Sequence, residues 1–170
     1  MTRTTGQAFP SIRSLVIGGL LLLVCWASAA RALPSEPPES LGVEQISVLE
    51  TLRRKDPQGA LQGLEAIVAH PDSPDEVRRE ATFVAAQIAR NEGLTEQEAR
   101  LRAQLVESAA AGEQGAALLV QVLDAYAQAE KGETAEAWRG LQPVVQEMAG
   151  FLGIREQARV ALVYGFLLDS

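Results

Sequence analysis

The stretch "KGETAEAWRGLQPVVQEM", Lys131 to Met148, shows most clearly how this chain is built. Its apolar side chains return at intervals of three and four residues, at Ala137, Trp138, Leu141, Val144, Val145 and Met148. That spacing places them along one stripe of an α-helix. The first three residues of the stretch, Lys131-Gly132-Glu133, supply a turn. The stretch therefore predicts an amphipathic helix that follows a glycine turn and buries one side against other helices.

The same pattern occurs at two earlier places in the chain. The segment "ALQGLEAIV" carries apolar residues at the same offsets, at Ala60, Leu61, Leu64, Ile67 and Val68, and a third copy is marked by Ala99, Ala103 and Val106. The alanines that open the three copies, Ala60, Ala99 and Ala137, therefore follow one another at nearly equal intervals. Self-similarity at an interval of this size is typical of stacked helical hairpins.

Turn signals divide the chain after Val43 into seven predicted helices, over residues 43–55, 58–70, 74–91, 95–110, 113–130, 134–149 and 153–170. Ser73 is expected to cap the third helix, and Thr95 with Glu98 to form a capping box on the fourth. Gly93 and Gly132 suit left-handed helix ends. The first six helices pair as three hairpins, and the seventh is left without a partner.

The segment "KGETAEAWRGL" resembles the turn and second helix of a tetratricopeptide repeat. Gly132 lies five residues before the small residue Ala137, and Leu141 and Val144 hold the following core positions. The resemblance implies an all-α, right-handed array of helical hairpins, a tetratricopeptide-like solenoid of about three and a half repeats. It also implies a face that binds a protein or peptide. A generic array of helical hairpins is the alternative and gives the same architecture.

The N-terminal segment, residues 1–32, has the layout of a secretory signal peptide. Arg3 and Arg13 precede a continuous apolar run, and small residues ending in Ala30-Arg31-Ala32 follow it, which favours cleavage after Ala32, with cleavage after Ala29 as the alternative. We therefore predict an exported, periplasmic protein. Two alternatives are an uncleaved membrane anchor over residues 15–30, which is short for a spanning helix, and a lipoprotein processed at Cys25.

A segment rich in proline and glutamate, residues 33–40, is expected to be a linker, and residues 41–170 to be the helical repeat domain. Three of the fifteen basic residues lie in the predicted leader, whereas all twenty-two acidic residues lie beyond it, which leaves a net charge of −10 after cleavage. Such a surface repels phosphate backbones and anionic lipid. Nucleic-acid binding is therefore not expected, and membrane contact only if the leader is retained.

No residue pattern in the chain points to catalysis. Cys25 is the only cysteine and lies in the predicted leader, and His70, the only histidine, lies beside Asp72 and Asp75 in a loop bounded by prolines. That loop has no rigid geometry for a metal, so a helix C-terminal histidine is the preferred interpretation. We predict no enzyme activity, no catalytic residue, no metal and no cofactor.

Partner-binding residues are sought among the few aromatic and basic side chains. Tyr126 and Tyr164 lie one repeat interval apart, on first helices of their hairpins, so both are candidates for one binding face. Arg155 and Arg159 are expected to add charged contacts on that side, as are Arg78 and Arg79. Packing of the two tyrosines into the core is the alternative.

The last ten residues, "ALVYGFLLDS", read as an apolar helix with no predicted partner. Three explanations are open: the domain continues beyond Ser170, residues 160–168 form a dimer or docking surface, or the last helix folds back as a cap. The first is preferred. The function expected is a non-enzymatic scaffold that binds protein or peptide. The alternative is the sensory N-terminal region of a membrane-bound signalling protein, of the diguanylate cyclase or sensor kinase type.

Overall fold

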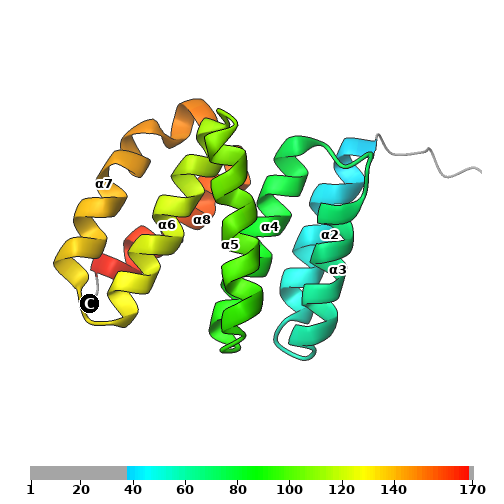
Figure 1. The fold of residues 1–170 in the computed structure, drawn as a ribbon, viewed down its shortest axis with the longest axis horizontal. Helices are drawn as coiled ribbons and strands as arrows, with labels where there is room; N and C mark the ends of the chain where they lie inside the picture. Colours follow the sequence, from blue (N-terminus) through cyan, green and yellow to red (C-terminus); the bar gives the residue numbers. More distant parts are fainter. Residues whose placement is uncertain (1–37, 169–170) are drawn as a thin grey trace, which may run out of the picture. The chain divides into compact units, whose positions relative to one another are not determined.

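The computed structural model describes residues 38–168, and within this part of the chain the fold is all-α, as predicted (Figure 1). It contains seven helices, namely α2 (Pro38–Leu52), α3 (Pro57–Ala69), α4 (Asp75–Asn91), α5 (Thr95–Ala110), α6 (Gln114–Glu130), α7 (Thr134–Phe151) and α8 (Ile154–Leu168). Each corresponds to one predicted helix, with ends that differ by a few residues. None of these helices is both long and apolar enough to cross a membrane.

The N-terminal boundary of α2 differs most from the prediction. The helix begins at Pro38, five residues before the predicted start and inside the predicted linker. Proline is tolerated in the first turn of a helix, where its missing N–H has no intrahelical partner. The predicted leader, residues 15–30 as a membrane anchor, Cys25 and the remainder of the linker lie outside the described residues.

Helix contacts divide α2 to α8 into two layers. Each helix packs against the next in sequence, and α2 also contacts α4, α4 contacts α6, and α6 contacts α8. Within residues 38–168, no packing of this extent joins α3, α5 and α7 to one another, although Gln97 and Arg100 of α5 bond to Glu65 on α3. We call α2, α4, α6 and α8 the inner layer and α3, α5 and α7 the outer layer. The helices of the outer layer begin at Pro57, Thr95 and Thr134, so their starts recur at a nearly constant interval.

Three successive helices end in the same way. Gly93, Gly112 and Gly132 have positive φ angles of 70°, 100° and 81° and follow α4, α5 and α6. In each case the next residue donates its backbone N–H to the carbonyl of the fifth residue before it, over 2.8 to 3.1 Å. This is the Schellman arrangement, which satisfies helix carbonyls and favours glycine at its left-handed position. The left-handed ends predicted at Gly93 and Gly132 are confirmed, and Gly112 adds one that was not predicted.

The predicted capping box on α5 is absent. The Thr95 hydroxyl lies 3.4 Å from the Gly93 carbonyl oxygen, and the Glu98 carboxylate accepts a hydrogen bond of 2.9 Å from Nε of Arg90. A guanidinium in the last turn of α4 thus takes the carboxylate that was expected to cap α5, because a charged donor is the stronger partner. The Glu98 N–H also bonds to the Leu94 carbonyl oxygen, so Leu94 holds the cap position and Thr95 already lies in the first turn of α5.

The prediction of Ser73 as a helix cap is also wrong. Pro74 occupies the position before α4, and the Ser73 hydroxyl instead donates to the carbonyl oxygen of Ile67 at 2.7 Å. That bond ties the loop to the last turn of α3, where carbonyls lack helical partners. A side-chain cap does occur on α3, where Asp56 accepts the Gly59 N–H at 2.8 Å.

The rotation of α5 about its axis differs from the predicted one. Ala60 and Ala137 are fully buried, as their repeat positions require, but Ala99 is exposed. The buried stripe of α5 is formed instead by Leu101 and Leu105. A leucine loses more apolar surface to water than an alanine, so the leucine side of the helix turns inward. The helix boundaries therefore repeat along the chain while the side-chain register of the middle copy does not.

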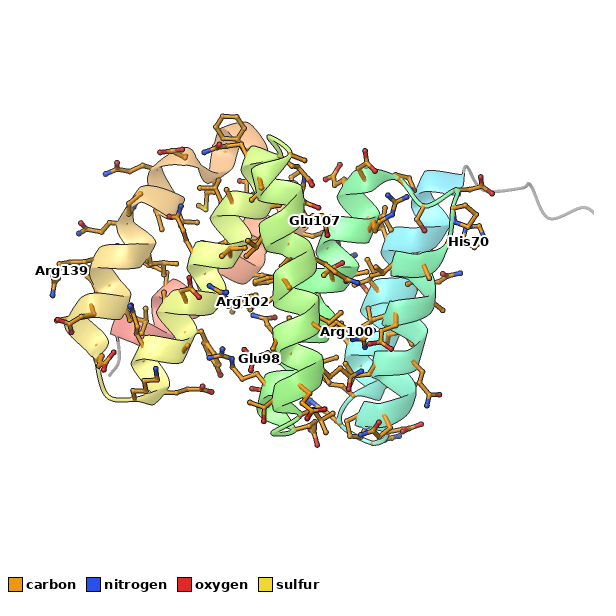
Figure 2. All side chains as sticks on the ribbon, in the orientation of Figure 1. His70, Glu98, Arg100, Arg102, Glu107 and Arg139 are labelled. Atoms are coloured by element: carbon orange, nitrogen blue, oxygen red, sulfur yellow. The ribbon has the colours of Figure 1, made fainter. Side chains whose placement is uncertain are left out.

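Charged side chains of α5 connect it to the helices on either side. Arg100 and Arg102 point away from opposite sides of the helix (Figure 2). Arg102 donates to both carboxylate oxygens of Asp124 on α6, at 2.7 and 2.9 Å, and Arg100 pairs with Glu65 on α3. All four side chains are partly exposed, so these pairs add little stability and act mainly on the alignment of neighbouring helices.

The apolar last helix is turned largely inward. In α8, Val160, Val163 and Leu167 are buried, whereas Leu162 keeps 75 % of its surface exposed. The helix packs against α6 and α7. The expectation that residues 160–168 present one open apolar surface therefore holds only for part of the segment.

Candidate functional site

The inner layer encloses a small cavity to which all four of its helices contribute. Its volume is about 200 Å³, and its lining residues are Glu50 and Arg53 at the end of α2, Gln87 and Asn91 on α4, Tyr126 on α6, and Arg159, Leu162 and Val163 on α8. A larger recess of about 400 Å³ lies between α3, α4 and α5. The smaller cavity is the candidate site, because a ligand there would touch every helix of the inner layer.

Two of the lining residues, Glu50 and Arg159, belong to a group of ion pairs that connects α8 with α2 and α4. Arg159 donates to Glu80 on α4 at 2.8 Å and also pairs with Glu50 on α2. Arg155 donates to the same Glu80 oxygen at 3.0 Å and to the Ser47 hydroxyl on α2 at 2.6 Å. The Glu80 side chain is only 4 % exposed, so two arginines offset the desolvation of its charge. Burial opposes the charge of Arg159, but hydrogen bonds and attraction from Glu50 and Glu80 raise its pKa.

A second buried ion cluster lies at the start of α8. Arg79 on α4 donates to both carboxylate oxygens of Glu156, at 2.8 and 2.7 Å, and to Glu113 at 2.6 Å. Glu156 is 1 % exposed and also accepts the Gly153 N–H at 2.9 Å. Burial disfavours the charge of Arg79, yet the hydrogen bonds of Glu156 and Glu113 outweigh it and raise the arginine pKa. This cluster fixes the beginning of α6 and of α8 against α4.

These contacts change the interpretation of the predicted basic residues. Arg155 and Arg159 were expected to reach a partner, and Arg79 with them, but each points into an ion pair with another helix. Arg78 bonds to Asp75 at 3.2 Å and to the Ser73 carbonyl oxygen. Arg79, Arg155 and Arg159 thus hold inner-layer helices together, whereas Arg78 bonds to its own helix and to the loop before it.

The two predicted tyrosines lie in different surroundings. Tyr126 is half-buried and lines the cavity. Tyr164 is also half-buried, but its ring stacks on Trp138 of α7, with ring centroids 4.5 Å apart and planes tilted by 31°. The cavity lining therefore includes Tyr126 and Arg159 among the predicted partner-binding residues, but neither Tyr164 nor Arg155.

Several polar groups at the cavity lack partners within residues 38–168. Nε of Arg159 is the buried side-chain polar atom without a hydrogen-bond partner in this part of the chain. Arg53 is half-buried and belongs to none of the ion pairs found there. The side-chain amides of Gln87 and Asn91 likewise have no hydrogen bond among the described residues. Arg53 and Gln87 are partly exposed and Asn91 is exposed, so their donor groups are available to a ligand at the cavity.

Sequence reasoning missed the polar residues that α4 contributes. Glu80, Gln87 and Asn91 stand at positions i, i+7 and i+11, which lie on one side of a helix. The remainder of α4 is buried almost all round, including Phe83 and Val84. A polar stripe on an otherwise apolar helix was therefore the signal in the sequence.

His70 follows the last residue of α3, close to the predicted helix end. Its Nδ1 accepts the Asp72 N–H at 3.2 Å. Among the described residues, no three side chains of the histidine, cysteine, aspartate and glutamate types are grouped in a way that could hold a metal ion. The side chains at the cavity offer guanidinium, amide and phenol groups, which are suited to binding oxygen atoms.

The chain matches no family model, no curated protein and no solved structure. The cavity and the two layers of helices are therefore the observations that bear on function.

Proposed function

We propose that the helical domain, residues 41–170, is a non-enzymatic scaffold that binds a protein or peptide partner on its inner layer. The proposal includes a right-handed, tetratricopeptide-like arrangement of hairpins. It is supported by the contacts of α2 with α4, α4 with α6 and α6 with α8, and by outer-layer helices that begin at nearly equal intervals. Stacked hairpins that share one continuous layer present an extended surface of this kind.

The observation that carries the proposal is the cavity on the inner layer. Its lining combines Tyr126, the exposed Leu162 and two amides of α4 that have no partner in the described part of the chain. Aromatic, amide and apolar groups close together are the usual means of holding an extended chain. The partner is therefore expected to place at least one side chain against this lining.

A peptide selection tests the proposal. The purified chain is used to select binders from a library of random peptides, and the binders are then measured against variants by calorimetry. The double variant Gln87→Ala with Asn91→Ala should weaken binding by about tenfold, since two hydrogen bonds are removed. The double variant Gln142→Ala with Gln146→Ala is the matched control, because these exposed residues have the same spacing on α7. Equal binding by both variants would refute an inner-layer site.

The proposed place of action is the periplasm, which is supported by the layout of residues 1–32. Expression with the native leader in a bacterial host should give an exported product whose mass corresponds to cleavage after Ala32. Retention of the full mass in the membrane fraction would instead support an anchor over residues 15–30.

The sensory alternative differs from the scaffold in the kind of ligand that occupies the cavity. A volume of about 200 Å³ suits one side chain or one small molecule. A free small molecule as its occupant would support a sensory input domain more than a scaffold.

A further inference from the structure

We propose that the cavity on the inner layer binds a single carboxylate group attached to a short apolar chain. The proposal rests on the proposed function, since it names the chemistry of the group that the inner layer recognises. Arg53 is the principal donor. Its guanidinium is half-buried at the cavity and has no ion pair within residues 38–168. A guanidinium with a free edge binds carboxylates through parallel, charge-assisted hydrogen bonds.

The charges around the cavity leave room for one anion. Among its lining residues, Arg53 and Arg159 contribute two positive charges and Glu50 contributes one negative charge. One positive charge therefore remains, in a chain whose net charge is −7. A monocarboxylate neutralises it, whereas a cation adds to an excess already present. Charge complementarity therefore favours a negatively charged ligand.

Hydrogen-bonding capacity at the cavity points to an acceptor. The side-chain amides of the half-buried Gln87 and of the exposed Asn91 have no hydrogen bond among the described residues. A carboxylate oxygen in the cavity provides an acceptor for these amides and for the guanidinium of Arg53. An aliphatic or aromatic hydrocarbon provides none.

The apolar residues of the lining indicate the chemistry of the part of the ligand that lies beyond its carboxylate. Val163 forms part of the wall, and Leu162 stands next to it on α8 with most of its surface exposed. The volume of about 200 Å³ far exceeds the roughly 10–15 Å³ that a single water needs. A chain of a few carbons attached to the carboxylate can cover these residues. It belongs either to a free organic acid or to an acidic side chain of a peptide partner.

Butyrate and its neutral analogue butyramide distinguish charge recognition from simple filling of the cavity. Each is titrated into the full chain labelled with nitrogen-15 while the Nε–H of Arg53 and the side-chain amide of Gln87 are followed by nuclear magnetic resonance. We expect butyrate to shift both signals with a Kd on the order of 1 mM, as suits so small a ligand. Butyramide should bind at least tenfold more weakly, because it forms no charge-assisted bond.

Two arginines next to each other in sequence provide a matched pair of variants. Arg53→Gln should weaken butyrate binding about tenfold or more, since it removes the principal donor. Arg54→Gln makes the same substitution at an exposed residue that does not line the cavity, and should leave binding unchanged. Both positions are near the end of α2, so the two variants carry a similar risk to folding, which circular dichroism checks.

The selected peptides separate the two sources of the carboxylate. If replacement of one Glu or Asp in such a peptide by its amide abolishes binding to the wild type, the carboxylate belongs to a protein partner. If butyrate binds and no peptide does, the ligand is a free acid. The scaffold proposal then fails, whereas the proposal of a carboxylate site stands. If the peptides bind on the inner layer and their amide forms bind equally well, the scaffold stands and the carboxylate site is refuted. Equal affinity for butyrate and butyramide, or no effect of Arg53→Gln, also refutes it.

Discussion

Arg79 connects parts of the chain that are far apart in sequence. Its guanidinium bonds to Glu113 just before α6 and to Glu156 in the first turn of α8. The start of α6 approaches it closely, because a Cβ atom at Gly115 would lie 2.9 Å from the guanidinium. A side chain at position 115 would collide with Arg79, so glycine is required there. A single side chain thus sets the positions of two inner-layer helices.

Replacement of Glu156 by alanine is expected to lower the free energy of unfolding by about 3 kcal/mol. The substitution leaves Arg79, whose side chain is 10 % exposed, with one carboxylate instead of two, and buried charges that lose a partner are costly. Urea unfolding followed by circular dichroism measures the loss. Glu136→Ala, which removes an exposed partner of Arg139, should cost below about 1 kcal/mol. Similar losses for the two variants would contradict a special role for the buried cluster.

The middle outer helix, α5, tests which side chains decide how a helix turns in its layer. Leu101 is 1 % exposed and Val106 42 % exposed, although the repeat pattern favoured the side that carries Val106. Leu101→Ala should therefore destabilise the protein by about 3 kcal/mol through lost burial and a cavity. Val106→Ala should change the free energy of unfolding by less than about 0.5 kcal/mol. The opposite order, measured by urea unfolding, would restore the register first inferred from the alanines.

The glycine that ends α5 gives a second test on a helix boundary. Gly112 has φ of 100°, and no atom lies within 4 Å of the place that a Cβ would take, so only its backbone conformation excludes a side chain. Gly112→Ala should cost about 1 kcal/mol, because L-residues are strained there. Gly150 lies inside α7 with equally open surroundings, and Gly150→Ala should be neutral or stabilise by up to about 1 kcal/mol. The thermal unfolding temperature should therefore fall for Gly112→Ala and stay the same or rise for Gly150→Ala, and a similar fall for both variants would argue against this account.

Helices could be predicted from the sequence because their signals are local. The glycine stops, the apolar spacing and the proline at the start of α3 each act within a few residues. Features decided by distant partners could not be predicted in this way. The Glu98 carboxylate, expected to cap α5, pairs with Arg90 of another helix. Arg155 and Arg159, expected to contact a partner, pair with Glu80 on α4. The candidate site has the same character, since Tyr126 was found from its spacing but Arg53 and Gln87 are identified only by the cavity that they line.

Across the described helices, α8 is the last helix and is joined to α2, the first one. Arg155 and Arg159 reach Ser47 and Glu50 on α2, although more than a hundred residues separate them in sequence. The apolar residues of α8 pack toward α6 and α7, so its attachment to α2 rests on polar side chains. The attachment depends on the geometry of these hydrogen bonds and ion pairs, so a change of charge at one partner should weaken it.

Reversal of the charge at Glu50 should therefore loosen α8 while the first hairpin stays intact. Glu50→Arg replaces the partner of Arg159 by a second cation, and we expect the amides of α8 to exchange with solvent about tenfold faster. Hydrogen exchange followed by mass spectrometry resolves α8 from α3, whose amides should keep their rates. Glu44→Arg makes the same charge change at an exposed position of α2 and should leave α8 protected. Because added salt screens like charges, it should narrow the difference between the two variants. Equal protection of α8 in both would mean that apolar packing on α6 and α7 is enough to hold the helix in place.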